Sequence, residues 1–261
     1  MVRRRLSRSS LGVWAALLIG LTLAGCATAP PARQPISPEA DAARALLGER
    51  WRAFADLRTL AEIRIRRGNK RQRLAGALLL RAPASLSFEA LSPFGTPVVV
   101  VAGDASRVTL WEVLDERAFI LPASPAANRR WLGLALGEDD LVALLSGRVL
   151  PLQDPLAAEL LPPDLVGHSL RLTGPEGQQR VWFDPSSGQA LQAEWMGGSS
   201  PLRAVFLKSS SNGGPGGLTL TTLDGQFEVA VSYRNPQLNT GFDPELLRLT
   251  VPEHVRIQDF R

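Results

Sequence analysis

The sequence has few of the side chains from which disulfides and metal sites are built. Its 261 residues include one cysteine, Cys26, and two histidines, His168 and His254. A single thiol cannot form a disulfide within the chain, so we expect an apolar core to hold the fold. Neither histidine has a cysteine or a second histidine at the spacing that zinc sites use, so we expect no metal.

Motifs for covalent catalysis and for nucleotide binding are also missing. The serines that follow Gly197-Gly198 are not in a Gly-x-Ser-x-Gly arrangement, which excludes a nucleophile elbow. The glycine-rich segment 213–217 lacks the Lys-Ser/Thr pair of a phosphate-binding loop. Asp139 and Asp140 are better explained as charges at a helix start than as a catalytic pair. We therefore expect no cofactor and no enzymatic activity.

Most of the chain lacks a net charge of either sign. The formal charge is +4, from 29 basic and 25 acidic residues. Four arginines lie within the first 25 residues and no acidic residue does, so the remainder has no net charge. Nucleic-acid binding depends on dense neutralisation of phosphates, so we expect no nucleic-acid partner.

The N-terminal segment has the parts of a secretory signal. Its arginines precede an apolar run at 11–23, which is too short to span a bilayer as a helix. Leu23-Ala24-Gly25-Cys26 follows directly and resembles the lipobox of bacterial lipoproteins. The resemblance implies a signal peptide at 1–25 and an acylated Cys26, whose several chains would anchor the protein stably. Aspartate after the cysteine usually retains such proteins in the inner membrane, so Ala27 implies the periplasmic face of the outer membrane of a Gram-negative bacterium.

The rest of the chain divides into a short tether and one domain. Residues 26–37, the acylated cysteine and a Pro- and Ala-rich stretch, predict a flexible tether, and residues 38–261 predict the domain. Ser37-Pro38 indicates a helix start, and apolar residues three or four apart extend the helix to about residue 56.

Alternating apolar and charged residues begin at residue 59, and short segments of this kind, separated by turn residues, recur toward the C-terminus. Between them we expect a loop at 124–130, a short helix at 137–145 and an irregular apolar segment at 149–163. The predicted fold class is mainly β with helices (α+β). It is an incomplete antiparallel β-barrel of about 11 strands closed by short helices.

Six short motifs, in order along the chain, carry a family resemblance. They are Cys26 in its lipobox, Trp51 with segment 60–65, the strand and turn at 86–95, the strand at 108–111, the helical segment 141–145 with Gly147 and Pro151, and Asp243-Pro244-Glu245-Leu246-Leu247 with Val251-Pro252. This series resembles the LolA/LolB-like family of lipoprotein carriers and outer-membrane receptors.

The resemblance implies a half-barrel with an apolar cavity for the acyl chains of lipoproteins or lipids. A chain of roughly 16 carbons is worth roughly 12 kcal/mol at about 0.8 kcal/mol per CH₂, so only a large apolar cavity can compete with a bilayer. The inward positions that we expect to line it are Ile63, Ile65, Leu78, Phe88, Val108, Leu110, Leu141, Leu145, Trp182 and Trp195.

The resemblance also implies a membrane-inserting loop at Pro93, Phe94 and Gly95. LolB has an exposed leucine at the tip of the matching loop, and this chain has Phe94 there. Two alternatives stay open for Phe94, because an aromatic ring between proline and glycine either inserts into a membrane or packs under its own turn.

Two functions are compatible with these observations. In the first, an outer-membrane lipoprotein binds acyl chains of lipoproteins or lipids and assists their localisation to the outer membrane, receiving cargo from a LolA-like periplasmic carrier. In the second, an accessory or scaffold lipoprotein acts through protein contacts without lipid transfer. The state of the cavity, open or filled, distinguishes them.

Overall fold

The computed structural model describes residues 33–197, 201–208 and 214–260. The predicted signal peptide, the lipidation site Cys26 and the tether as far as residue 32 lie outside these ranges. Within the later part of the predicted tether, the backbone N–H of Gln34 donates to the carbonyl of Leu156 at 2.7 Å. In the described ranges, no helix has both the length and the apolar character needed to cross a membrane.

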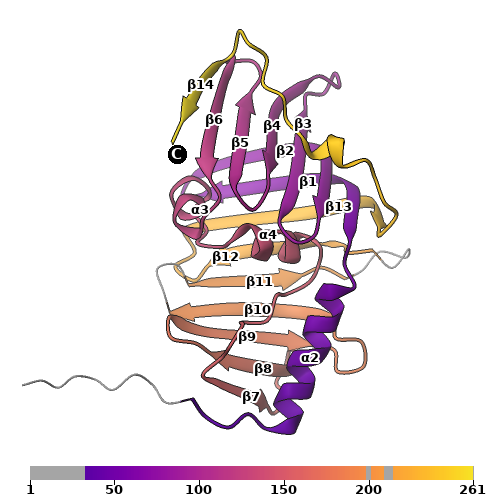
Figure 1. Ribbon diagram of the computed structural model, residues 1–261, viewed down its shortest axis with the longest axis vertical. Helices are drawn as coiled ribbons and strands as arrows, with labels where there is room; N and C mark the ends of the chain where they lie inside the picture. The colour runs from indigo at the N-terminus through magenta and orange to yellow at the C-terminus, as the bar shows by residue number, and fades with distance from the viewer. Residues whose placement is uncertain (1–32, 198–200, 209–213, 261) are drawn as a thin grey trace, which may run out of the picture. The chain divides into compact units, whose positions relative to one another are not determined.

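One sheet of 14 strands forms the framework of the described chain (Figure 1). The strands are β1 (Asp56–Arg67), β2 (Lys70–Arg81), β3 (Ser85–Leu91), β4 (Pro97–Gly103), β5 (Arg107–Glu112), β6 (Arg117–Pro122), β7 (Ala157–Leu161), β8 (His168–Thr173), β9 (Gly177–Phe183), β10 (Ala190–Gly197), β11 (Leu202–Phe206), β12 (Gly217–Thr222), β13 (Phe227–Leu238) and β14 (Arg256–Asp259). Their order across the sheet is β14-β6-β5-β4-β3-β2-β1-β13-β12-β11-β10-β9-β8-β7.

The sheet is curled but does not close. Its two edge strands, β14 and β7, do not pair with each other. In Figure 1, strands β3–β6 run nearly across the direction of β8–β12, so the sheet turns strongly between its two halves. The prediction of a mainly β, incomplete barrel with helices is confirmed. It has 14 strands where about 11 were expected, and one pair, β14 with β6, is parallel.

Strand β1 shows why one face of this sheet is apolar. Leu57, Thr59 and Ala61 are buried, whereas Arg58 and Leu60 between them are exposed. Side chains alternate between the two faces of a strand, so this pattern directs one set toward the core and the other toward solvent.

Helices α2 (Pro38–Arg52) and α4 (Glu138–Leu145) cover the apolar face. The hydroxyl of Ser37 accepts the N–H of Ala40 at 3.2 Å and begins α2, which packs against β7 and β8 (Figure 1). Acidic residues fill the first turn of α4, where they interact favourably with the helix dipole. Buried Leu141 and Leu144 direct α4 toward β2, β3 and β12.

The expected loop at 124–130 is wrong, because this segment begins helix α3 (Pro125–Leu132). The hydroxyl of Ser124 accepts the N–H of Ala127 at 3.2 Å, and Gly133 ends the helix with a φ of 81°. A capping serine before proline begins α3 just as it begins α2.

One strand falls where the sequence predicts none. The segment 149–163, expected to be irregular, contains β7 at the sheet edge. Pairing with β8 supplies the order that this short segment lacks locally. The chain ends with the short 3₁₀ helix η1 (Pro244–Leu247) and then β14.

Candidate functional site

The curled sheet buries one apolar cluster on its inner face. Directly paired residues share a face, and the row Leu170, Val181, Ala193, Ala204 and Leu220 crosses β8 to β12 in this way. All five are buried in the cluster. Side chains of α2 and α4 belong to the same cluster, so helices and sheet enclose a single core.

Most positions predicted to line an acyl cavity face this cluster. Leu78, Phe88 and Leu141 are buried within it. The partly buried residues packed against it include Ile63, Ile65, Leu145 and Trp195. The register Phe88–Val101–Leu110 places Leu110, and with it Val108, on the same face farther along the sheet.

Trp182 lies on the opposite face of the sheet. Its neighbours Val181 and Phe183 belong to the inner cluster, and adjacent residues of a strand point to opposite sides. Its Nε1–H donates to both carboxylate oxygens of Asp164, at 3.0 and 2.9 Å. The prediction that Trp182 lines the cavity is therefore wrong, because the alternation along β9 directs its side chain to the outer face of the sheet.

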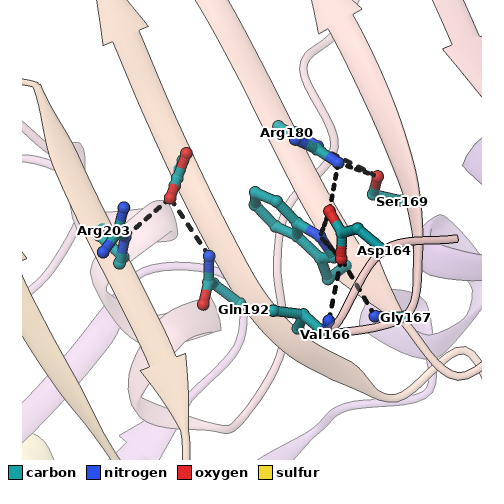
Figure 2. A network of polar contacts seen from close by, with 9 residues as sticks. Asp164, Val166, Gly167, Ser169, Arg180, Gln192 and Arg203 are labelled. Atoms are coloured by element: carbon teal, nitrogen blue, oxygen red, sulfur yellow. Dashed lines mark hydrogen bonds and ion pairs between the residues drawn. The ribbon is translucent and has the colours of Figure 1, made fainter. Parts of the chain in front are cut away.

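The carboxylate of Asp164 organises the outer loop beside Trp182. Figure 2 shows it between Arg180 and the backbone of Val166 and Gly167. The Arg180 guanidinium lies 4.0 Å from the centre of the Trp182 ring. The Trp182 hydrogen bond, with those of the loop backbone, lowers the pKa of Asp164, so the loop is held by a carboxylate that stays charged.

The centre of the inner face is filled by the protein's own side chains. Leu57, Leu78, Leu80, Leu144 and Leu170 are each no more than 2% exposed. Beside this packed centre, a groove of about 220 Å³ opens between α2 and strands β7–β9. Its lining residues are Glu39, Ala42, Ala43, Leu46, Leu160, His168, Phe183 and Pro185.

The groove is smaller than the roughly 300–1,000 Å³ of pockets that enclose a drug-sized ligand. It is mainly apolar, and it lies where α2 meets the sheet edge. A groove of this size has room for a short apolar segment.

The start of α4 contains one buried acid, Glu138, and two partly buried ones, Asp139 and Asp140. Burial and the nearby charge of Asp139 raise the pKa of Asp140 to about 6. Burial also raises the pKa of Glu138, although the side-chain amide of Asn128 donates to it at 2.9 Å. These carboxyls belong to the helix that covers the inner face, so its stability should respond to pH.

Asp140→Asn should stabilise the fold by about 1 kcal/mol more near pH 7.5 than near pH 5, because the cost of ionising Asp140 grows between its unfolded pKa and about 6. In the folded state the pKa of Asp140 lies above its unfolded value, so this group favours folding at low pH. That stability is lost as the pH rises through about 6. Urea unfolding at about pH 5 and about pH 7.5 measures the difference. Equal pH dependence in the wild type and the variant would contradict it.

The turn between β3 and β4 presents Phe94 to solvent. The Ser92 hydroxyl accepts the N–H groups of Phe94 and Thr96, at 3.3 and 3.2 Å, and Gly95 adopts a φ of 81°. Phe94 is 93% exposed, so it does not pack under this turn. An ordered turn thus holds an aromatic ring outward at the end of two strands.

A second apolar tip, missed by the sequence analysis, lies at the same end of the sheet. Leu114, in the turn between β5 and β6, is 80% exposed. The N–H of Val113 donates to Val98 O at 3.1 Å, so this turn adjoins the start of β4 and hence the Phe94 turn. A leucine between two strands, followed by Asp115 and Glu116, is the signal that could have found it.

In the part of the chain that the structure describes, no group of three His, Cys, Asp or Glu side chains is placed to hold a metal ion. His168 lines the groove under α2, whereas His254 is exposed before β14. The site is therefore an apolar face with an adjoining groove and two exposed tips.

No protein-family model and no curated sequence matches the chain, but solved structures match its fold. A DUF1329 family protein from Desulfovibrio piger has a TM-score of 0.57 at 10% identity, over 81% of this chain and 98% of that one. An outer-membrane lipoprotein-sorting protein domain from Vibrio parahaemolyticus has a TM-score of 0.53 at 13% identity, over 80% of this chain and 94% of that one. A LolA superfamily protein from Nitrosomonas europaea has a TM-score of 0.51 at 12% identity, over 79% of this chain and 97% of that one. The chain thus has the fold of LolA-superfamily domains.

Proposed function

From this shared fold, we propose that the protein is a lipid-anchored protein of the bacterial envelope that binds acyl chains of lipoproteins or lipids. The observation that carries the proposal is the apolar inner face with its groove between α2 and the sheet edge. The neighbour from Vibrio parahaemolyticus is described by lipoprotein sorting, which supports the same class of cargo.

Acyl binding would begin in the groove and displace α2. The buried residues of the helix are Ala40, Ala43 and Leu47, and Leu46 and Trp51 pack against the cluster as well. Two of the three buried side chains are alanines, so separating this part of the helix from the sheet exposes less apolar area than three large side chains would. An entering acyl chain covers the exposed area again and offsets the cost of opening.

Delivery to the membrane would use the two exposed tips. Phe94 and Leu114 project from neighbouring turns and can enter the apolar layer of a bilayer without any change in the sheet. A phenylalanine or leucine contributes roughly 1.5–3 kcal/mol when it is fully buried. Together with acylated Cys26 they would hold the domain at the outer membrane, where a LolA-like periplasmic carrier could hand over cargo.

Ala42→Trp should reduce acyl uptake several-fold, because Ala42 lines the groove and is itself exposed, so the indole blocks the opening at small cost to folding. The measurement is transfer of an acylated lipoprotein from its periplasmic carrier to the full-length protein in detergent micelles. Ala45→Trp is the matched control, because Ala45 is an exposed alanine of the same helix outside the groove. Equal uptake by both variants would place acyl binding elsewhere.

An accessory or scaffold role is the second candidate, and the filled centre of the inner face favours it. In that case the wild-type protein takes no cargo from the carrier although it is folded. Protein contacts at the outer membrane would then be its activity.

A further inference from the structure

Two arginines meet where the C-terminal ends of α2 and α4 come together. Arg50 lies in the last turn of α2, and Arg148 follows α4. Arg148 is only 7% exposed. Its Nε–H donates to Arg50 O at 3.0 Å, and its Nη1 donates to Ser146 O at 2.6 Å. Its guanidinium also lies 4.9 Å from the centre of the Phe54 ring.

These contacts orient Arg148 but do not supply a negative charge. Carbonyl oxygens and an aromatic face carry only partial charges. Among the ion pairs of the described residues, none includes Arg50 or Arg148. Burial, with the nearby charge of Arg50, lowers the pKa of Arg148 to about 10, so it remains charged at neutral pH.

Arg50 has donor capacity that the described chain does not use. Its Nε–H is buried and has no hydrogen-bond partner within the described ranges. Its Nη1 has a long contact, 3.5 Å, with Ser187 O. A buried polar group without a partner is costly, and two like charges side by side add to that cost. Both costs fall if an anion lies between the guanidinium groups.

A partly enclosed pocket occupies this place. Arg50, Arg148 and Gln189 contribute its polar wall, while Ala190, Phe206 and Leu238 form an apolar side. Its space of about 20 Å³ takes one group of the size of a water molecule, such as a single oxygen of a larger anion. The three apolar residues also belong to the inner cluster or pack against it.

We propose that this pocket binds a phosphate group, with one oxygen between the guanidinium groups of Arg50 and Arg148. Guanidinium is the side chain best suited to phosphate oxygens, because it is planar, permanently charged and rich in donors. The phosphate comes either from solution or from a phospholipid headgroup. In the second case the lipid tail lies against the inner cluster, and only that case rests on the proposed function.

The test uses the full-length protein in uncharged detergent micelles, with inorganic phosphate as the probe. Phosphate should raise the midpoint of thermal unfolding and broaden the ³¹P resonance of the ion. Arg50→Gln should weaken phosphate binding about tenfold or more, and Arg50→Lys should restore part of it. Arg52→Gln is the matched control, since Arg52 is exposed on the same helix and does not line the pocket.

Two outcomes would overturn the proposal. One is equal phosphate binding by wild type and Arg50→Gln. The other is equal stabilisation by chloride and phosphate at the same ionic strength. Short-chain phosphatidylglycerol identifies the source of the phosphate group. If the protein prefers it over both inorganic phosphate and a phosphate-free glycolipid, the pocket binds a lipid headgroup. Binding of inorganic phosphate does not require acyl uptake, so the phosphate site can be established even if the proposed function is refuted.

Discussion

Phe94→Glu is expected to reduce delivery of an acylated lipoprotein into vesicles about tenfold or more, with uptake from the carrier unchanged. The ring is 93% exposed on an ordered turn, so its loss does not disturb the core. Burying a phenylalanine contributes roughly 1.5–3 kcal/mol, whereas a carboxylate opposes entry into an apolar layer. Delivery is measured as cargo that floats with liposomes after incubation with the loaded, full-length protein.

Three further variants make this result specific to the tip. Phe94→Leu should retain most of the delivery, because leucine also enters the apolar layer. Leu114→Glu should weaken delivery, since it changes the adjoining tip. Leu165→Glu is the matched control, because Leu165 is a fully exposed leucine in the loop between β7 and β8. Full delivery by Phe94→Glu, or an equal loss with Leu165→Glu, would refute a membrane role for the tip.

Leu144→Ala should lower the free energy of unfolding by about 2–5 kcal/mol. Leu144 is 1% exposed and is directed by α4 into the inner cluster. Truncation removes apolar contacts and leaves a cavity, because the surrounding strands can relax only in part. Urea denaturation followed by tryptophan fluorescence or circular dichroism measures the change.

The size of this effect reports on the state of the inner face. Leu114 is an exposed leucine outside the core, so Leu114→Ala serves as the control and should change the free energy of unfolding by no more than about 0.5 kcal/mol. A loss of less than about 1 kcal/mol for Leu144→Ala would mean that α4 is loosely packed and that the face is open in solution. A large loss supports a packed face that opens only when cargo enters.

Local signals predicted the helices and strands where the chemistry is short-range. Ser37-Pro38 predicted the start of α2, and its serine caps the helix as expected. The alternation from residue 59 predicted β1 and its single wet face. The same capping logic at Ser124-Pro125 was overlooked, so α3 was predicted to be a loop.

Predictions that depend on partners far along the chain were weaker. Strand β7 is short and lies among prolines, and only its pairing with β8 makes it a strand. The face on which Trp182 lies depends on the register of β9, since a shift of one residue exchanges the two faces. Leu114 could be placed beside Phe94 only when the order of β3 to β6 was known.

The sequence by itself determined a lipobox-like N-terminus, a mainly β domain and the absence of familiar catalytic motifs, because these depend on composition, period and neighbouring residues. The tertiary structure decided which side chains fill the inner face, which turns lie together at one end, and that Arg50 meets Arg148. These outcomes depend on strand order, curl and helix docking. Strand order, curl and helix docking are set by the summed free energy of many contacts between residues far apart in the sequence. No single stretch of the chain determines them.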